Sequence, residues 1–517
     1  MKKILPSDEM LRVDRATVDA GSLTSLSLME NAAVAVTSII EDIFSGGVSG
    51  ERMLILCGRG NNGGDGAAIA RLLTEAGARV DALLIGRVDD TSGDARINFG
   101  KCHGLSACED DEAVRSAFTA ALAAGPSVVI DAMFGTGLRR PLSGMHLELA
   151  ESLVALKRQE SDRPLIISVD VPSGVDSDRS EPIGVSVIAD MTVTFTAPKP
   201  ACVLPPVSTA CGELFVADIG SPPELIDSCM SQEYLAEESD AADWLQATSF
   251  TDDSYKNVRG HAVLVAGSEE YAGAAVLCAN AAIRSGAGLV TLATPVTAAE
   301  SIISRLEPEV IVRSVSCAAD LVRAIAGADA LGIGSGLGRL FSRSELLQII
   351  ETRMVPTVVD ADGLNSIAPM ESLSGRGIPL ILTPHQGEFL RLTGLSREQF
   401  ESDRIGALRA FSTRSHVCVV LKGQRNLVGL PDGRVIVVPT GNPGLGKAGN
   451  GDNLAGMITG FLAQGARFGV GAHETLIAAV YIAGLAGDIA EERWGARVLT
   501  ASDVRDCLSE AFRSLEF

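Results

Sequence analysis

The chain has 517 residues, of which 46% are hydrophobic and 54 are glycine. This length and composition indicate a globular protein with room for two or three domains, and they exclude a disordered or collagen-like chain. The net charge of −22 argues against non-specific binding to nucleic acid or anionic membranes, although backbone N–H groups can still hold a nucleotide locally.

The N-terminal stretch "MKKILPSDEM" carries Asp8 and Glu9 where a signal peptide needs an apolar core. No later window offers the roughly 18 uncharged apolar residues of a membrane span. The ten cysteines show no CxxC spacing and the six histidines no HExxH motif, which predicts free thiols in a reducing compartment and argues against structural zinc. We therefore expect a soluble, cytoplasmic protein that binds neither nucleic acid nor membranes.

The first half of the chain alternates short apolar runs with helical patterns from about Met53 onward. The runs are "MLILC", "VDALLI", "SVVIDAM", "LIISVDV" and "MTVTFTA", and segments such as "GAAIARLLTEAG" have amphipathic helical periodicity. This order is typical of a parallel, doubly wound sheet. We predict a Rossmann-like α/β domain with three αβα layers over residues 1–222.

The alternation stops over residues 221–257, which are acidic, contain paired prolines and lack strand character. We interpret residues 223–245 as a connector. From His261 strand-like runs return, at "HAVLVAG", "GLVTLATP", "ADALGIG", "VPTVVDAD", "IPLILTP" and "VCVVLKG", and the tail from about Asn453 is mainly of helical type. A second, unlike α/β domain is predicted over residues 246–517.

Three polar loops of the first half follow predicted strands. "CGRGNNGGDG" ends one strand and opens a helix, while Asp131 and Asp170 end two others, and Ser173 follows the second. The carboxyl ends of parallel strands meet at one edge of a sheet, so these loops predict a single site. Two structural alternatives stay open, in which Asp65 caps the helix and Asp170 caps the turn that follows it.

The first half resembles the epimerase domain for hydrated nicotinamide nucleotides, over about residues 1–220. The resemblance rests on "MLRVDRATVDAGSLTSLSLMENAA", "CGRGNNGGDG", "DAMFGTGLRRPLSG", "VDVPSGVDSD" and "ADMTVTFTAPKP". It implies interconversion of the C6 epimers of NADHX and NADPHX, the hydrates of NADH and NADPH. We interpret Asp170 as the general acid/base, because epimerisation at a carbinolamine-like carbon needs a proton removed and returned.

The same resemblance implies a set of ligand-binding residues. Those expected to contact the hydrated nucleotide are Asn61, Asn62, Gly63, Gly64, Asp65, Gly135, Thr136, Gly137, Leu138, Arg139, Arg140, Pro141 and Asp170. Those expected to bind K⁺ are Asn62, Asp131 and Ser173, which carry oxygen donors suited to a hard cation.

A glycine-rich loop in the second half, "GNPGLGKAGNGD", begins like a P-loop, with GxxxxGK over residues 441–447. A P-loop needs a Ser or Thr after its lysine to reach Mg²⁺, and its helix begins there. Here Ala448 follows and the chain is still glycine-rich, so we expect the helix to begin over residues 449–452. The motif is therefore interpreted as a GxGD loop, with backbone N–H groups aimed at a phosphate and an aspartate in the first helical turn.

This GxGD loop resembles the anion hole and catalytic base of ribokinase-like sugar and vitamin kinases. Together with "GHAVLVAGSEEYAGAAVLCANAAIRSGAGLVTLATP", "GIGSGLG", "VVDADGLN", "LTPHQGEFLRLTG", "VVLKG" and "GNPG", it resembles the dehydratase for hydrated nicotinamide nucleotides over about residues 245–515. The whole chain thus resembles the bifunctional bacterial NAD(P)HX epimerase/dehydratase family. That family implies a ribokinase-like αβα second domain and a homo-oligomer.

The resemblance implies that Asp452 deprotonates the C6 hydroxyl of the S hydrate, which attacks the terminal phosphate of ADP and releases AMP. Phosphate then leaves and NAD(P)H is restored, with Mg²⁺ as the metal of this step. Residues expected to contact the hydrate are Ala274, Gly336, His385 and Asp452, although His385 can also be a loop histidine bonded to backbone. Residues expected to bind the nucleotide are Lys422, Gly423, Gln424, Arg425, Asn426, Gly449, Asn450 and Gly451.

The second half departs from the family pattern at three places. Lys447 and Ala448 replace a Thr-Gly pair, Gln386 replaces a proline, and Asn257 replaces a glycine. Lys447 can add a cation beside the phosphates, whereas the Cβ of Ala448 can restrict the loop. Two alternatives therefore stay open for the second domain: an ATP-dependent small-molecule kinase with a stable product, and an inactive nucleotide-binding domain fused to an active epimerase.

Overall fold

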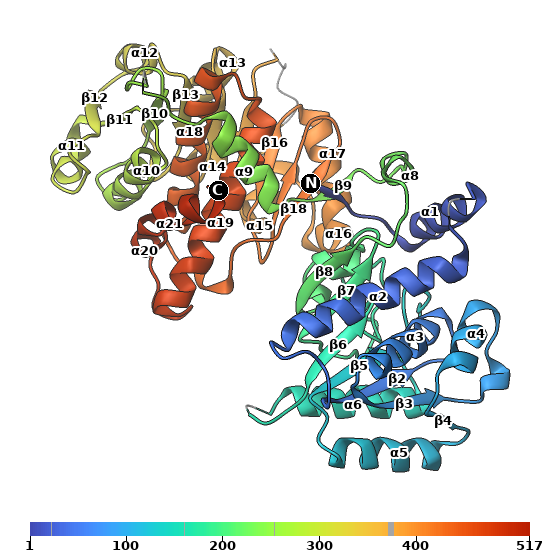
Figure 1. Cartoon of the computed structure of the whole chain (residues 1–517). Helices are drawn as coiled ribbons and strands as arrows, with labels where there is room; N and C mark the ends of the chain where they lie inside the picture. The colour runs from blue at the N-terminus through green and yellow to red at the C-terminus, as the bar shows by residue number, and fades with distance from the viewer. Residues whose placement is uncertain (22, 160, 253, 371–376, 517) are drawn as a thin grey trace. The chain divides into compact units, whose positions relative to one another are not determined.

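The computed structural model describes residues 1–21, 23–159, 161–252, 254–370 and 377–516. The chain divides into an N-terminal unit, Lys2–Ser231, and a C-terminal unit, Gln232–Phe517, to which Met1 also belongs (Figure 1). Within the described ranges, no helix combines the length and the apolar character that crossing a membrane requires.

The N-terminal unit is built on a seven-stranded sheet in which all neighbouring strands run parallel. The strand order reverses direction beside β2, because β3 follows it on one side and β5 on the other. Loops after β2 and β5 therefore diverge and leave a crevice at their carboxyl ends. The order is β4 (Leu105–Cys108), β3 (Arg79–Ile85), β2 (Arg52–Cys57), β5 (Val128–Ala132), β6 (Leu165–Val169), β7 (Met191–Phe195) and β8 (Glu213–Ala217).

Helices cover both faces of this sheet, which explains why its central strands are apolar on both sides. On β2, the side chains of Met53 and Ile55 pack with α2, α3 and α4, whereas those of Leu54 and Leu56 pack with α5 and α6. The elements of this unit outside the sheet are β1 (Lys2–Lys3), α1 (Ser7–Asp19), α2 (Ser25–Ile43), α3 (Asn61–Glu75), η1 (Val88–Asp90), α4 (Gly93–Lys101), α5 (Asp111–Ala123), α6 (Gly144–Lys157), α7 (Pro200–Val203), η2 (Val207–Ala210) and α8 (Pro223–Asp227).

The C-terminal unit has a mixed sheet. Its strands are parallel from β16 through β12 in the order below, β17 is antiparallel to both of its neighbours, and β9 is parallel to β18. The order is β9 (Glu233–Leu235), β18 (Val435–Val438), β17 (Asn426–Gly429), β16 (Cys418–Leu421), β15 (Leu380–Leu382), β14 (Thr357–Val359), β13 (Ala330–Ile333), β10 (His261–Val265), β11 (Leu289–Pro295) and β12 (Ile311–Val315).

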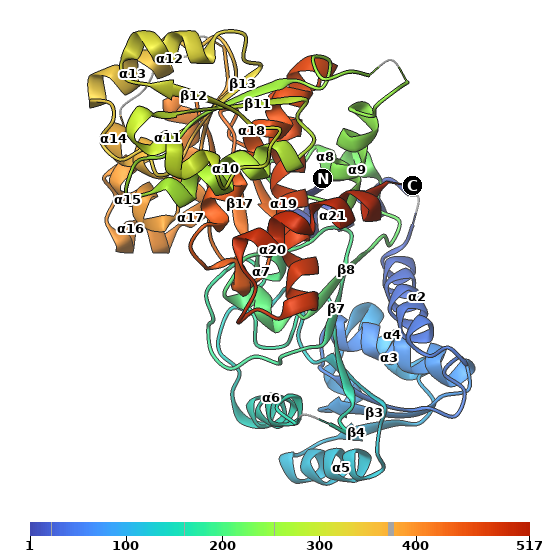
Figure 2. The ribbon, with the colours of Figure 1, turned by 90° about the vertical axis from the view of Figure 1, so that its left-hand side faces the viewer.

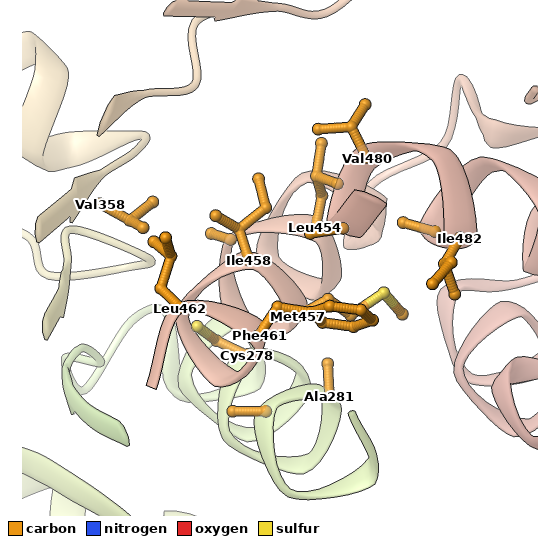
Figure 3. Close-up of a cluster of buried hydrophobic side chains, with 14 of the residues drawn as sticks. Cys278, Ala281, Val358, Leu454, Met457, Ile458, Phe461, Leu462, Val480 and Ile482 are labelled. Atoms are coloured by element: carbon orange, nitrogen blue, oxygen red, sulfur yellow. The ribbon is translucent and has the colours of Figure 1, made fainter. Parts of the chain in front are cut away.

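Helix α18 is central to the packing of this unit. Its Met457 and Phe461 lie in one core with α10 and α19, as Figure 3 shows, while α12 and α13 pack on the opposite face of the sheet (Figure 2). The helices are α9 (Glu238–Ala247), α10 (Ala272–Arg284), α11 (Val296–Ile303), α12 (Ala318–Ile325), α13 (Arg343–Glu351), α14 (Asp362–Ile367), α15 (Gln386–Thr393), α16 (Arg397–Ser402), α17 (Arg404–Ser415), η3 (Pro443–Leu445), α18 (Asn450–Phe468), α19 (Ala472–Trp494), α20 (Ala501–Asp506) and α21 (Leu508–Leu515).

The prediction of two α/β domains with largely parallel sheets is confirmed. Two local predictions were wrong. Residues 221–257 do contain a strand, β9, which has only three residues and so shows no alternation; α9 follows it and buries Trp244 in the core. Helix α3 begins at Asn61, inside the glycine-rich loop, and not at the apolar periodic segment that starts near Gly66.

Candidate active sites

A cavity of about 710 Å³ lies at the carboxyl ends of the strands in the N-terminal unit. Helices α1 and α2 form part of its wall, and the loops after β2 and β5 form another part. Nine of the predicted substrate residues line it: Asn61, Asn62, Asp65, Gly135, Thr136, Gly137, Leu138, Arg139 and Asp170.

Four predicted contacts, namely Gly63, Gly64, Arg140 and Pro141, do not line this cavity. A Cβ on Gly63 would lie 1.8 Å from the carbonyl oxygen of Gly58, and one on Gly64 would lie 2.7 Å from the Cα of Ala95. These two glycines therefore let α3 pack closely against its neighbours. Arg140 and Pro141 are exposed on the loop that follows β5.

Asp170 ends β6 and forms an ion pair with the buried Lys199. The Lys199 Nζ lies 2.6 Å from Asp170 Oδ1 and also donates to Thr194 Oγ1 and to the carbonyl oxygen of Phe195. Asp170 has a φ of +67°, a conformation that costs energy in a non-glycine residue and that is often found at functional sites. Its side chain pairs with Lys199 and Thr194 rather than with the backbone of the next turn, so the capping alternative does not describe it.

Two further carboxyl groups, Asp14 and Asp65, line the same cavity. Burial raises the pKa of Asp65 well above its usual range, and the charges of Asp170 and Asp14 add to this rise. Burial also raises the pKa of Asp14, which the charge of Lys199 lowers in part. Because α3 begins four residues before Asp65, with Gly60 as its N-cap, Asp65 is not the helix cap.

Asp131 lies at the end of β5 with no exposed surface. It accepts hydrogen bonds from Ser173 Oγ at 2.6 Å, Ser173 N at 2.8 Å and Ser168 Oγ at 3.0 Å, all of which are neutral donors. Burial raises the pKa of Asp131, against the effect of these bonds. The amide nitrogen of Asn62 is buried and has no hydrogen-bond partner among the described residues.

Arg139, a predicted substrate contact, is already engaged by acidic side chains. Its guanidinium lies 2.6 Å from Asp176 Oδ1 and 2.7 Å from Asp178 Oδ2 and also contacts Ser7 Oγ. The charge of Arg139 is therefore largely compensated within the protein, and the loop after β5 is fixed to α1 and to the segment after β6.

In the C-terminal unit, the GxGD loop leads directly into α18, with Asp452 in the first turn. The left-handed position of this loop falls on Gly449, with a φ of +95°. A Cβ there would also lie 2.7 Å from Leu277 Cδ1, so the backbone conformation and the lack of space both require glycine. The helix begins three residues after Lys447 rather than at it, which confirms that the loop is not a P-loop.

Burial raises the pKa of Asp452 to about 6, and the charge of Asp360 adds to the rise, whereas a hydrogen bond with Ser335 and the charge of Lys422 oppose it. A carboxylate with such a pKa is well matched to a general base near neutral pH. Lys422 Nζ lies 2.8 Å from Asp360 Oδ1, and both groups are close to Gly451, at 3.3 and 3.8 Å from the position of a Cβ there.

A cavity of about 600 Å³ adjoins this loop. Six of the predicted nucleotide contacts line it, while Arg425 and Gly449 do not. Apolar side chains, among them Leu454, Met457 and Ala483, also line it, so the cavity offers polar and apolar surfaces to one ligand. The six lining contacts are Lys422, Gly423, Gln424, Asn426, Asn450 and Gly451.

The predicted hydrate contacts of this unit divide into two groups. Ala274 and Gly336 are neighbours, because a Cβ on Gly336 would lie 2.8 Å from that of Ala274. Ser335, which precedes Gly336 in the chain, forms a hydrogen bond with Asp452. His385 instead caps α15, with Nδ1 accepting from the N–H groups of Gly387 and Glu388 at 3.0 and 3.4 Å. The structural alternative for His385 is therefore observed, and its Nε2 lies 3.6 Å from Oε1 of Glu388 in the same cap.

The two departures in the GxGD loop have structural roles. Lys447 Nζ donates to the carbonyl oxygens of Arg497 and Leu499, at 2.5 and 2.8 Å, so it holds the loop to the segment before α20. The interpretation of Lys447 as a cation beside the phosphates does not fit this geometry. Ala448 does not take a left-handed conformation, so its Cβ imposes no backbone strain.

Four residues of these sites were missed by sequence reasoning: Asp14, Lys199, Ser335 and Asp360. Lys199 offered a signal, since it is a lone lysine in the apolar stretch "TFTAPKP" just after a strand. Asp14 offered none, because an acidic residue in an amphipathic helix is ordinarily a solvated one.

Comparison with known proteins gives matches to both units. A family model described as NAD(P)H-hydrate dehydratase matches residues 262–509, and one described as YjeF-related protein N-terminus matches residues 25–201.

No cluster of three His, Cys, Asp or Glu side chains suited to a metal ion is present in the part of the chain that the structure describes.

Curated relatives match over nearly the full length. The bifunctional NAD(P)H-hydrate repair enzyme of Moorella thermoacetica is 35% identical, with 99% of this chain and 97% of that protein covered. The enzymes of the same name from Thermofilum pendens and Escherichia coli are 34% and 29% identical, covering 99% and 96% of this chain and 97% and 92% of their own length. The crystal structure of ADP/ATP-dependent NAD(P)H-hydrate dehydratase from Bacillus subtilis, with ATP and Mg²⁺, is 28% identical over 55% of this chain and 99% of that one, with a TM-score of 0.48.

Proposed function

The chain belongs to the family of bifunctional NAD(P)H-hydrate repair enzymes, and we propose that its two units carry the two activities in one polypeptide. The N-terminal unit interconverts the R and S epimers of NADHX and NADPHX. The C-terminal unit dehydrates the S epimer to NAD(P)H at the expense of ADP, with AMP and phosphate released. We assign Lys2–Ser231 to the epimerase and Gln232–Phe517 to the dehydratase, because most of the connector expected over residues 223–245 contributes β9 and α9 to the dehydratase unit.

The observation that carries the epimerase assignment is the ion pair of Asp170 with buried Lys199 at the cavity wall. Lys199 pairs with Asp170 and fixes its position, since it also bonds to Thr194 and to backbone. Asp170 then serves as the base that removes the proton from the C6 hydroxyl of the hydrate.

We propose that a potassium ion binds beside the hydrogen-bonded pair of Asp131 and Ser173, with Asn62 as a further oxygen donor. Asp131 is a fully buried carboxylate with only neutral hydrogen-bond donors, and a buried charge needs compensation. Oxygen donors of carboxylate, hydroxyl and amide type suit a hard monovalent cation better than a transition metal. When bound, K⁺ would supply positive charge and order the loops that follow β5 and β6.

In the dehydratase, Asp452 acts as the base, as its raised pKa of about 6 allows. It removes the proton of the C6 hydroxyl, whose oxygen attacks the terminal phosphorus of ADP while AMP leaves. The N–H groups at the start of α18 face the transferring phosphoryl group and stabilise its charge, an effect that commonly amounts to several kcal/mol. Phosphate then leaves C6 and C5 loses a proton, which restores the C5=C6 double bond of the dihydronicotinamide.

The cavity beside Lys422 and Asn450 is the proposed site of ADP, since the N-terminus of α18 and the lysine complement its phosphates. Mg²⁺ in such sites is held by substrate phosphates, waters and one or two carboxylates, and Asp360 is the buried carboxylate beside the loop. When bound, Mg²⁺ would neutralise charge on the phosphates. We also propose that the protein is cytoplasmic, in line with its ten free cysteines. As the resemblance to the family implies, we propose that it forms a homo-oligomer.

Two single-site variants test the assignment. Asp170→Asn should restore NADH from S-NADHX with ADP but not from R-NADHX, and Asp452→Asn should restore it from neither epimer. A mixture of the two variants should restore it from both, because each contributes one intact site. The proposal fails if Asp452→Asn still dehydrates S-NADHX, or if the mixture of two folded variants leaves R-NADHX unchanged.

A further inference from the structure

Epimerisation requires two proton transfers, and Asp170 accounts for only one of them. The C6 hydroxyl must lose a proton, and the ring nitrogen N1 must gain one when the C6–N1 bond opens. Asp170 Oδ1 accepts a hydrogen bond from the ammonium of Lys199 at 2.6 Å, so this ion pair places Asp170 to accept a proton rather than to give one. A second group that carries a proton must therefore reach the same cavity.

Asp14 meets this requirement from a different wall of the cavity. It projects from α1, whereas Asp170 ends a strand, and both line the cavity. Its Oδ1 is buried and has no hydrogen-bond partner among the described residues, an environment that penalises a carboxylate and favours the neutral acid. The charged or titratable groups that surround the cavity with it are Asp65, Asp170, Lys199, Arg59, Arg139 and His146.

We propose that Asp14 is the general acid of the epimerase and works with Asp170 as the base. This inference rests on the proposed epimerase function. Asp170 takes the proton of the C6 hydroxyl, the C6–N1 bond breaks with its electron pair passing to N1, and N1 takes the proton of Asp14. The product is a C6 aldehyde with N1 as a secondary amine.

The cycle closes by the reverse steps on the other face. After rotation about the C5–C6 bond, N1 attacks the aldehyde carbon and returns its proton to Asp14, while the oxygen takes the proton back from Asp170. One C–N bond breaks and one forms, no electron is gained or lost overall, and both carboxyl groups end in their starting states. A pair with one ionised and one neutral carboxyl group suits a reaction that must run in both directions.

Asp14→Asn in the full-length chain tests this assignment, with R-NADHX or S-NADHX supplied singly together with ADP. Recovery of NADH from the R epimer needs both sites, whereas recovery from the S epimer needs only the dehydratase. We expect Asp14→Asn to slow recovery from R-NADHX by about 10²–10⁴-fold, with recovery from S-NADHX unchanged. The alkaline decline of the wild-type R-epimer rate, caused by loss of the acid's proton, should be absent in the variant.

Asp19→Asn is the matched control, because Asp19 is exposed at the end of the same helix and should leave both rates unchanged. Asp14→Glu keeps the proton and should retain more activity than Asp14→Asn, which separates chemistry from folding. An Asp14→Asn chain within about threefold of the wild-type R-epimer rate would overturn the assignment, as would a loss seen in Asp65→Asn but not in Asp14→Asn. If the wild-type chain recovers NADH from S-NADHX but nothing from R-NADHX, the epimerase function itself is wrong.

Discussion

Replacement of Asp452 by asparagine separates the energetic cost of this half-buried carboxylate from its use in catalysis. Burial and the nearby Asp360 raise its pKa to about 6, from an ordinary value near 4. A difference of about two pKa values corresponds to about 3 kcal/mol between the two protonation states. Ionisation of Asp452 in the folded protein costs this much free energy at pH 8, and an asparagine avoids the cost because it does not ionise.

The raised pKa also decides the sign of the pH dependence. The folded state binds the proton of the Asp452 carboxyl group more tightly than the unfolded state does. The contribution of this group to the free energy of unfolding is therefore full below about pH 4 and is lost as the pH rises through 6. We expect Asp452→Asn to raise the free energy of unfolding of the C-terminal unit by about 2–3 kcal/mol at pH 8, and by about half as much at pH 5. The same variant should lose about 10²–10⁴-fold in NADH recovery from S-NADHX.

Tryptophan fluorescence during urea unfolding measures this effect in one unit. Both tryptophans of the chain, Trp244 and Trp494, belong to the C-terminal unit, so the signal follows that unit alone. Asp243→Asn, at an exposed position of α9, is the control and should give no pH-dependent gain. The reasoning is refuted if Asp452→Asn destabilises the unit at pH 8, or if its difference from the wild type is the same at pH 5 and pH 8.

Four further results are expected. Lys199→Met should slow recovery from R-NADHX at least about 100-fold while S-NADHX is dehydrated normally, since Asp170 loses its buried partner; equal loss with both epimers would contradict this. Lys447→Met should lower the unfolding free energy of the C-terminal unit by about 1–3 kcal/mol in the same fluorescence assay, because two hydrogen bonds to carbonyl oxygens are lost; no change would show that the contact is not formed. Gly449→Ala should lower S-NADHX dehydration without affecting epimerisation, as its φ of +95° and the close Leu277 leave no room for a Cβ; an unimpaired dehydratase would be the contrary result. Exchange of K⁺ for Li⁺ should slow recovery from R-NADHX alone, and an equal slowing with S-NADHX would place the ion in the other unit.

The fold was largely predictable because its signals are local. Apolar runs ended by glycine-rich loops mark the strands and the edge where the sites lie, and the GxGD loop marks the start of α18 without any tertiary information. Helix α3 shows the limit of this approach. The segment "NNGGDG" has poor helix propensity, yet it is helical because Gly63 and Gly64 allow close packing that no other residue would permit.

The partners within the sites were beyond sequence reasoning because they depend on tertiary packing. Lys199 lies 29 residues after Asp170 and reaches it only through the geometry of β7, and Asp14 joins them from the first helix of the chain. Similarly, the environment of Asp452 comes from Ser335, Asp360 and Lys422 on three other segments. No spacing rule connects such residues, although each follows from the sheet order once the fold is known.

The most direct test of the account is the yield of NADH from an equilibrated mixture of R- and S-NADHX, incubated with the purified chain and ADP. The near-UV absorbance of restored NADH follows the reaction. With both sites active, recovery should reach the full amount of hydrate, because the epimerase converts R to S as S is consumed. Recovery that stops at the S fraction would show a dehydratase without an epimerase, and no recovery would show that the GxGD loop is inactive.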